Sequence, residues 1–155
     1  MSAQAAVVVR PVEEGDFPGW LPLWNGYNAF YGRHGETALP DEVTTMAWRR
    51  FFDPTEPMFA LVATLDEQVV GLAHYLYHRS TTRIDLVCYL QDLFTLQSER
   101  GRGIGKALIK GVYAQAEAVG VKRVYWHTHE TNNAGRLLYD KVARHAGFIV
   151  YAHEA

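Results

Sequence analysis

The most informative segment of the chain reads Arg100-Gly101-Arg102-Gly103-Ile104-Gly105-Lys106 and lies between an expected strand and an expected helix. Glycines allow the backbone to curl so that successive N–H groups point at one anion. The helix that follows adds unpaired N–H groups and the positive end of its dipole. Arg100, Arg102 and Lys106 supply formal positive charge. The segment therefore predicts a phosphate-binding turn.

Residue identity excludes two common nucleotide-binding motifs at this turn. A P-loop would need a glycine where the chain has Arg100 and a serine or threonine where it has Ala107. The dinucleotide fingerprint would need a glycine in place of Lys106 and should follow an early strand. The phosphate ligand is therefore expected to be of another kind.

The spacing of apolar residues on both sides of the turn predicts the remaining elements. Before it, we expect strands at 7–12, 58–65, 69–77 and 84–95, and helices at 16–31, capped by Asp16, and at 40–51. After it, we expect a helix at 103–119, a strand at 121–127, a helix from 132 or 133 to 146, and a strand at 148–151. The order β-α-α-β-β-β-α-β-α-β predicts an α/β (α+β) fold with a mixed sheet covered on both faces.

Composition places the chain among ordinary globular proteins. Its 155 residues suit a single domain, 1–155, with 48% hydrophobic and 21% charged residues. The beginning lacks the features of a signal peptide, and no apolar run is long enough to span a membrane. The single cysteine, Cys88, excludes an internal disulfide and a cysteine-based zinc site, so we expect a cytoplasmic protein. His127 and His129 have no third ligand at a suitable spacing, and no metal is predicted.

Charge is unevenly divided between the two halves. Residues 1–78 hold four basic and ten acidic side chains, a net charge of −6, whereas residues 79–155 hold eleven basic and seven acidic ones, a net charge of +4. A basic half suits a polyanionic ligand and an acidic half suits a cationic one. The alternative interpretation, that solvated charges are scattered by chance, explains the asymmetry equally well. The near-neutral chain has no lysine-rich tail, so neither a nucleic-acid nor a membrane partner is expected.

The pattern R-x-x-G-x-G, from Arg100 to Gly105, resembles the pyrophosphate-binding motif of the GNAT superfamily of N-acetyltransferases. The segment 89–95 resembles that family's fourth strand. The segment from Asn132 to Tyr139 resembles its N-x-x-A-x-x-L-Y motif, with Gly135 replacing alanine. Segments 21–27 and 124–132 look like the branch named for yeast acetyltransferases of histones, polyamines and D-amino acids, and the resemblance covers residues 7–152.

The resemblance implies the GNAT fold and transfer of an acetyl group from acetyl-CoA to a primary amine. It implies that backbone groups of Leu93, Phe94 and Thr95 bind the acetyl-pantetheine arm, and that Asn132 also bonds the pantetheine. Tyr139 would be the general acid for the departing thiolate. The alternative is that Asn132 is a helix N-cap and Tyr139 a packing residue. The residues expected to hold the pyrophosphate are Arg100, Gly101, Arg102, Gly103, Ile104, Gly105 and Lys106.

No general base is assigned from the sequence. The relatives that acetylate polyamines often carry glutamate where this chain has Gln91, and Asp92, Glu130, His74 or a chain of waters could replace it. The aromatic residues of the first helix fit a core stripe better than an aromatic edge for an amine; they are Trp20, Trp24, Tyr27 and Tyr31.

Two further expectations concern function class and assembly. A non-catalytic module that binds or senses acyl-CoA is the alternative to an enzyme, and it would not need a proton donor at Tyr139. The segment between Tyr139 and Gly147 is about one helical turn longer than in the family pattern, and only one strand fits after it. A sheet edge left open in this way predicts a homodimer.

Overall fold

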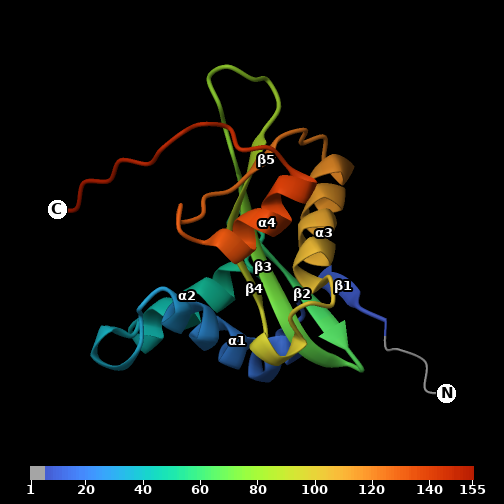
Figure 1. Cartoon of the computed structure of the whole chain (residues 1–155), viewed down its shortest axis with the longest axis vertical. Coiled ribbons are helices and arrows are strands. Elements are labelled where there is room, and N and C mark those ends of the chain that lie inside the picture. The colour runs from blue at the N-terminus through green and yellow to red at the C-terminus, as the bar shows by residue number, and fades with distance from the viewer. Residues whose placement is uncertain (1–5) are drawn as a thin grey trace.

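The structure is a computed structural model that describes residues 6–155. Its elements follow the predicted order as far as the last helix (Figure 1). The strands are β1 (Val8–Pro11), β2 (Met58–Leu65), β3 (Gln68–His78), β4 (Val87–Thr95) and β5 (Val124–Tyr125), and the helices are α1 (Phe17–Phe30), α2 (Asp41–Arg50), α3 (Ile104–Ala118) and α4 (Asn133–Val142). Short 3-10 turns occupy Glu14–Asp16, Gly35–Thr37 and Gln97–Glu99.

The five strands form one mixed sheet in the order β1-β2-β3-β4-β5. The first four strands are antiparallel neighbours, and β5 runs parallel to β4. β2 and β3 form a hairpin whose two turn residues, Asp66 and Glu67, both have positive φ, as the tightest hairpin turns require. The predicted α/β fold with a mixed sheet is therefore confirmed.

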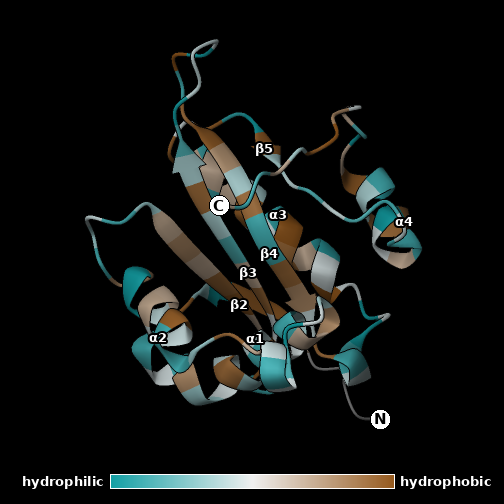
Figure 2. Cartoon of the chain, turned by 90° about the vertical axis from the view of Figure 1, so that its left-hand side faces the viewer, coloured by the Kyte–Doolittle hydropathy of each residue, from teal (hydrophilic) through white to brown (hydrophobic). Residues whose placement is uncertain are grey.

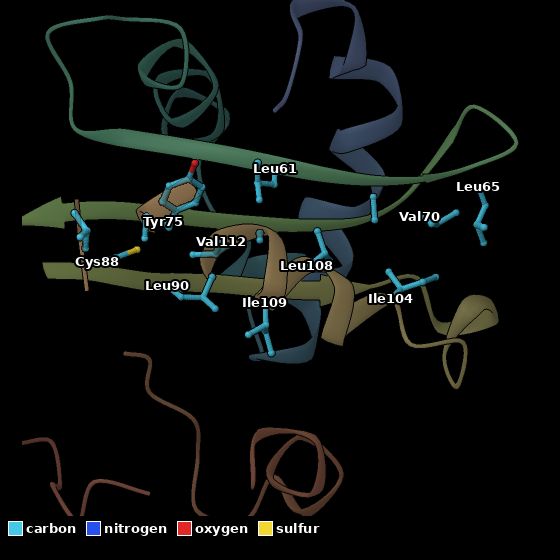
Figure 3. Packing of buried hydrophobic residues seen from close by; sticks show 14 residues of the cluster. Leu61, Leu65, Val70, Tyr75, Cys88, Leu90, Ile104, Leu108, Ile109 and Val112 are labelled. Atoms are coloured by element: carbon cyan, nitrogen blue, oxygen red, sulfur yellow. The ribbon is translucent and has the colours of Figure 1, made fainter. Parts of the chain in front are cut away.

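Helices cover both faces of the sheet (Figures 1 and 2). The apolar side of α3 packs on one face, where Leu108, Ile109 and Val112 are fully buried against β2, β3 and β4 (Figure 3). On the other face, Trp20 of α1 is fully buried beside Leu72 of β3. The predicted core role of the α1 aromatic stripe is thus confirmed for Trp20, Trp24 and Tyr27, while Tyr31 is 43% exposed.

A β-bulge in β4 changes which side chains face α1. His74 pairs with Asp92 but the next residue of β3, Tyr75, pairs with Leu90, so Gln91 is an extra residue in β4. Successive side chains alternate between faces, and one extra residue reverses the alternation beyond it. Leu90 packs in the core beneath α3, whereas Asp92 joins His74 on the α1 face.

Several local predictions were wrong. The side chain of Asp16 does not cap α1; both of its oxygens bind Arg10, at 2.7 and 2.8 Å. α4 ends at Val142 rather than at residue 146. The expected strand at 148–151 is absent: after α4 the chain runs as an extended tail away from the sheet (Figure 1), with Phe148 83% and Tyr151 89% exposed. An apolar run forms a strand only where a sheet edge receives it.

Among the described residues, no helix is both long enough and apolar enough to cross a membrane.

Candidate functional site

The glycine turn has the backbone conformation expected of an anion cradle. Gly101 and Gly103 have φ values of +84° and +78°, in the left-handed region that glycine adopts without a steric penalty. Gly103 is the N-cap of α3, so the turn leads directly into the unpaired N–H groups of a 15-residue helix. The side chain of Ile104 is buried in the core, which leaves only its backbone for a ligand. A phosphate group fits this geometry.

The three cations of the turn are placed differently. Arg100 is folded toward β4, since its Nε donates to the carbonyl of Thr95 at 3.3 Å and its guanidinium carbon lies 5.5 Å from the centre of the Phe94 ring. Arg102 is exposed and lies 3.3 Å from the carboxylate of Glu99. Lys106, in the first turn of α3, is exposed to solvent. All three residues are exposed, so none of these charges is withdrawn into the core.

Gly105 allows α4 to approach α3. A Cβ atom at this position would lie 3.1 Å from Cδ2 of Leu138 and 3.9 Å from the hydroxyl of Thr95. The third glycine of the turn therefore serves packing, and it brings the α4 helix close to the phosphate cradle.

The last two strands of the sheet, β4 and β5, separate on the way to this cradle. β5 pairs with β4 only at Cys88 and Tyr89, although the sequence predicted a strand over 121–127. From Leu90 to Thr95 the edge of β4 that faces α4 has no strand partner among the described residues. Leu93, Phe94 and Thr95, whose backbone groups the resemblance assigns to the acetyl-pantetheine arm, lie in this stretch. An extended chain can bind such an edge through main-chain hydrogen bonds.

Asn132 acts as the N-cap of α4. Its Oδ1 accepts a hydrogen bond from the backbone N–H of Gly135 at 3.2 Å, and its Nδ2 donates to the hydroxyl of Thr128 at 2.9 Å. A Cβ at Gly135 would collide with the present position of this amide, so glycine leaves room for the capping side chain as it is placed here. The side chain of Asn132 therefore caps the helix, which is the alternative role that the sequence offered for it.

Tyr139 lies on α4, seven residues after Asn132 and on the same stripe of the helix. Its ring packs edge-on against Trp126 with centroids 5.4 Å apart. Burial, with a smaller contribution from Tyr31 at the C-cap of α1, raises the pKa of its hydroxyl. The hydroxyl makes no hydrogen bond to another of the described residues, and none of their buried polar side-chain atoms lacks a partner, so solvent or a ligand reaches it.

The sequence named Asp92 and His74 only as separate candidates for the base, and it did not reveal that they form a buried polar relay with Trp20 on the α1 face. The indole N–H of Trp20 donates to Nε2 of His74 at 3.0 Å, and Nδ1 of His74 lies 2.9 Å from an oxygen of Asp92. Because indole N–H can only donate, Nε2 carries no proton, and the single ring proton sits on Nδ1 and is donated to Asp92. The sequence signal was present but weak: His74 is a polar residue within an otherwise apolar strand.

A cavity of about 380 Å³ lies between β5, α4 and the tail. Tyr139, Trp126 and Thr128 line it together with several cations, among them Arg83, Arg123 and Arg144. The glycine turn does not line it, so it is not the phosphate site. In residues 6–155, no group of three or more histidine, cysteine, aspartate or glutamate side chains is placed to hold a metal ion.

Comparison with known proteins gives a consistent result. The pattern of the acetyltransferase (GNAT) family matches residues 20–143. The D-amino-acid N-acetyltransferase HPA3 of Saccharomyces cerevisiae is 35% identical over 147 residues, which cover 94% of this chain and 89% of that protein.

Solved structures share the fold at lower identity. A ribosomal-protein-alanine N-acetyltransferase from Brucella melitensis biovar Abortus 2308 matches with a TM-score of 0.76 and 21% identity, over 97% of this chain and 100% of the other. The aminoglycoside N-acetyltransferase AAC(6')-Iy, in complex with CoA, matches with a TM-score of 0.82 and 17% identity, over 99% and 98%. The family match and the yeast relative show that this chain is an enzyme of the acetyltransferase (GNAT) family.

Proposed function

We propose that the enzyme transfers the acetyl group of acetyl-CoA to a primary amine, with both substrates bound at the same time. The observation that carries the proposal is the unpaired edge of β4 directly before the glycine turn. The turn and the start of α3 would hold the pyrophosphate, and the open edge from Leu93 to Thr95 would hold the pantetheine arm. Support for this ligand comes from AAC(6')-Iy, which has the same fold and was solved with CoA.

The reaction needs a neutral amine, a polarised thioester carbonyl and a proton for the leaving sulfur. The amine nitrogen forms a bond to the carbonyl carbon, the carbon–sulfur bond breaks, and the nitrogen loses a proton. A backbone N–H on the open edge of β4 would stabilise the negative charge that develops on the carbonyl oxygen. The thioester supplies the activated acetyl group.

Tyr139 is the proposed proton donor to the departing thiolate. Its hydroxyl has no competing hydrogen bond within the described chain, and its raised pKa keeps it protonated near neutral pH. It belongs to α4, which Gly105 brings close to the start of α3. In this proposal Asn132 contributes by fixing the start of α4 and so the position of Tyr139.

The experiment that tests the proposal measures thiol release from acetyl-CoA with a panel of primary amines. Thiol reagents will report CoA alone, because Cys88 is fully buried and burial raises the pKa of its thiol to about 12. Tyr139→Phe should lower kcat by about 10²-fold or more and leave the Kd for acetyl-CoA nearly unchanged. Acetyl-CoA binding without turnover on any amine would instead support a sensing module.

We also propose that the enzyme is a homodimer in the reducing cytoplasm. The outer edge of β5 has no strand partner among residues 6–155, and the apolar tail at Phe148–Tyr151 is exposed. An open edge and an unpaired apolar strand of the same chain can satisfy each other between two copies. The free, buried Cys88 is consistent with a reducing compartment.

A further inference from the structure

Two opposite charges lie beside the same pair of tyrosine rings without forming an ion pair. Tyr27 of α1 and Tyr31, the C-cap of this helix, have ring centroids 5.0 Å apart. The guanidinium carbon of Arg33 lies 5.9 and 5.5 Å from these two ring centres. The Asp92 carboxylate acts on the same rings, since after burial it is the largest cause of the raised pKa of both tyrosines, while Arg33 lowers both.

Asp92 carries a charge that no cation of the described chain neutralises. It is only 9% exposed, and within residues 6–155 no arginine or lysine lies within 4.0 Å of it. Its one ionic neighbour, His74, is neutral because Trp20 occupies Nε2. Hydrogen bonds from neutral groups such as His74 leave the charge of Asp92 unbalanced, and a buried carboxylate without a cation is unfavourable unless a ligand compensates it. The β4 bulge turns this carboxylate toward α1, on the side opposite the α3 core.

Arg33 is held in place by one end of its guanidinium. Its Nε donates to Oδ1 of Asn28 at 2.7 Å, and the buried Asn28 is in turn fixed by a bond from Nδ2 to the carbonyl of Trp24 at 2.9 Å. Its two terminal nitrogens make no hydrogen bond or ion pair to another residue in the described part of the chain. A fixed arginine with free terminal nitrogens binds carboxylates in a fork geometry.

We infer that the acceptor is an α-amino acid, with its ammonium group bound by Asp92 and its carboxylate by Arg33. The inference rests on the proposed function and names the substrate class of the same site. The rings of Tyr27 and Tyr31 would lie along the bound molecule between the two charges and favour the ammonium end through their faces. A polyamine would bring a second cation toward Arg33 and is disfavoured. The name of the yeast relative agrees with this chemistry.

The test compares each amino acid with its amide, which keeps the amine and removes the carboxylate charge. D- and L-phenylalanine and their amides are assayed for thiol release by the wild-type enzyme and by Arg33→Gln, Asp92→Asn and Arg49→Gln, the last being an exposed control on α2. For at least one enantiomer, the wild type and Arg49→Gln should prefer the free acid by about tenfold or more in kcat/KM. Arg33→Gln should reduce that preference to about one.

Asp92→Asn should lower kcat/KM for acid and amide by the same factor, about tenfold or more, and so keep their ratio. Unchanged acetyl-CoA binding and an unchanged thermal midpoint show that each variant is folded. A wild-type enzyme that acetylates amines but does not distinguish acid from amide would overturn the inference and leave the proposed function intact. An unchanged ratio in Arg33→Gln would also overturn it. Absence of turnover on every amine would refute the proposed function itself.

Discussion

Trp20 donates its indole N–H to Nε2 of His74 at 3.0 Å, and this bond fixes the protonation of the imidazole that supports Asp92. All three side chains are buried, at 0%, 3% and 9% exposure. Trp20 therefore fixes the protonation state of the histidine beside the proposed acceptor site, although its own side chain is fully buried. The effect of disrupting such a buried relay depends on which of its two hydrogen bonds is removed.

His74→Asn and His74→Gln should separate the two bonds. An asparagine amide can still donate to Asp92 from a position close to that of Nδ1, whereas a glutamine amide reaches Trp20 instead. We expect His74→Asn to keep the KM for the acceptor within about threefold, and His74→Gln to raise it about tenfold, since a hydrogen bond to a charged group is lost. Both should lower the free energy of unfolding by about 1–3 kcal/mol, because one buried group loses its partner. The measurements are acceptor KM and urea unfolding; equal KM values in the two variants would assign His74 a purely structural role.

Glycine at position 103 should be essential to the phosphate cradle. Gly103→Ala places a Cβ at φ +78°, which costs about 1–2 kcal/mol and pushes the backbone away from the cradle conformation. We expect the Kd for acetyl-CoA to rise about tenfold, as measured by isothermal titration calorimetry. Gly15→Ala is the matched control, since its φ is not positive and no atom lies within 4 Å of the added Cβ. Equal affinities of the two variants would argue against the cradle.

The conformation of the glycine turn at residues 100–106 was predictable from sequence. Glycines adopt the left-handed backbone that such a turn needs, and the adjacent cations indicate an anionic ligand. Other features were not. The bulge at Gln91 adds one residue without altering the apolar pattern of β4, yet it decides that Asp92 faces α1. Arg10 lies six residues before Asp16 and takes its carboxylate away from the helix cap. The strand expected at 121–127 is only two residues long, because β5 diverges from β4 beyond Tyr125. Each of these outcomes depends on contacts between elements and not on local preference.

The pH dependence of kcat should show no alkaline decline below about pH 10. Burial raises the pKa of Tyr139 above its ordinary value near 10, so the protonated, donating form persists as pH rises through that range. The acceptor must lose a proton before it attacks, so kcat should increase with pH and then level off. Steady-state kinetics from pH 6 to 10 at saturating substrates provide the measurement. In Tyr139→Phe the rate should be low at every pH; a decline of the wild-type rate between pH 8 and 9 would assign proton donation to a different group.

The exposed tail should be required for the dimer. Phe148, Ile149, Val150 and Tyr151 are 83%, 73%, 65% and 89% exposed, an apolar run that a folded protein normally covers. If this run pairs with β5 of a second copy, Ile149→Asp places a charge within the new sheet edge and should raise the dimer dissociation constant by about tenfold or more. Size-exclusion chromatography with light scattering, at several concentrations, measures the shift.

Val119→Asp serves as the control, because Val119 is an apolar residue of similar exposure, 63%, at the end of α3. A wild-type monomer at micromolar concentration would contradict the dimer, and an Ile149→Asp dimer as stable as the control would place the contact elsewhere on the surface.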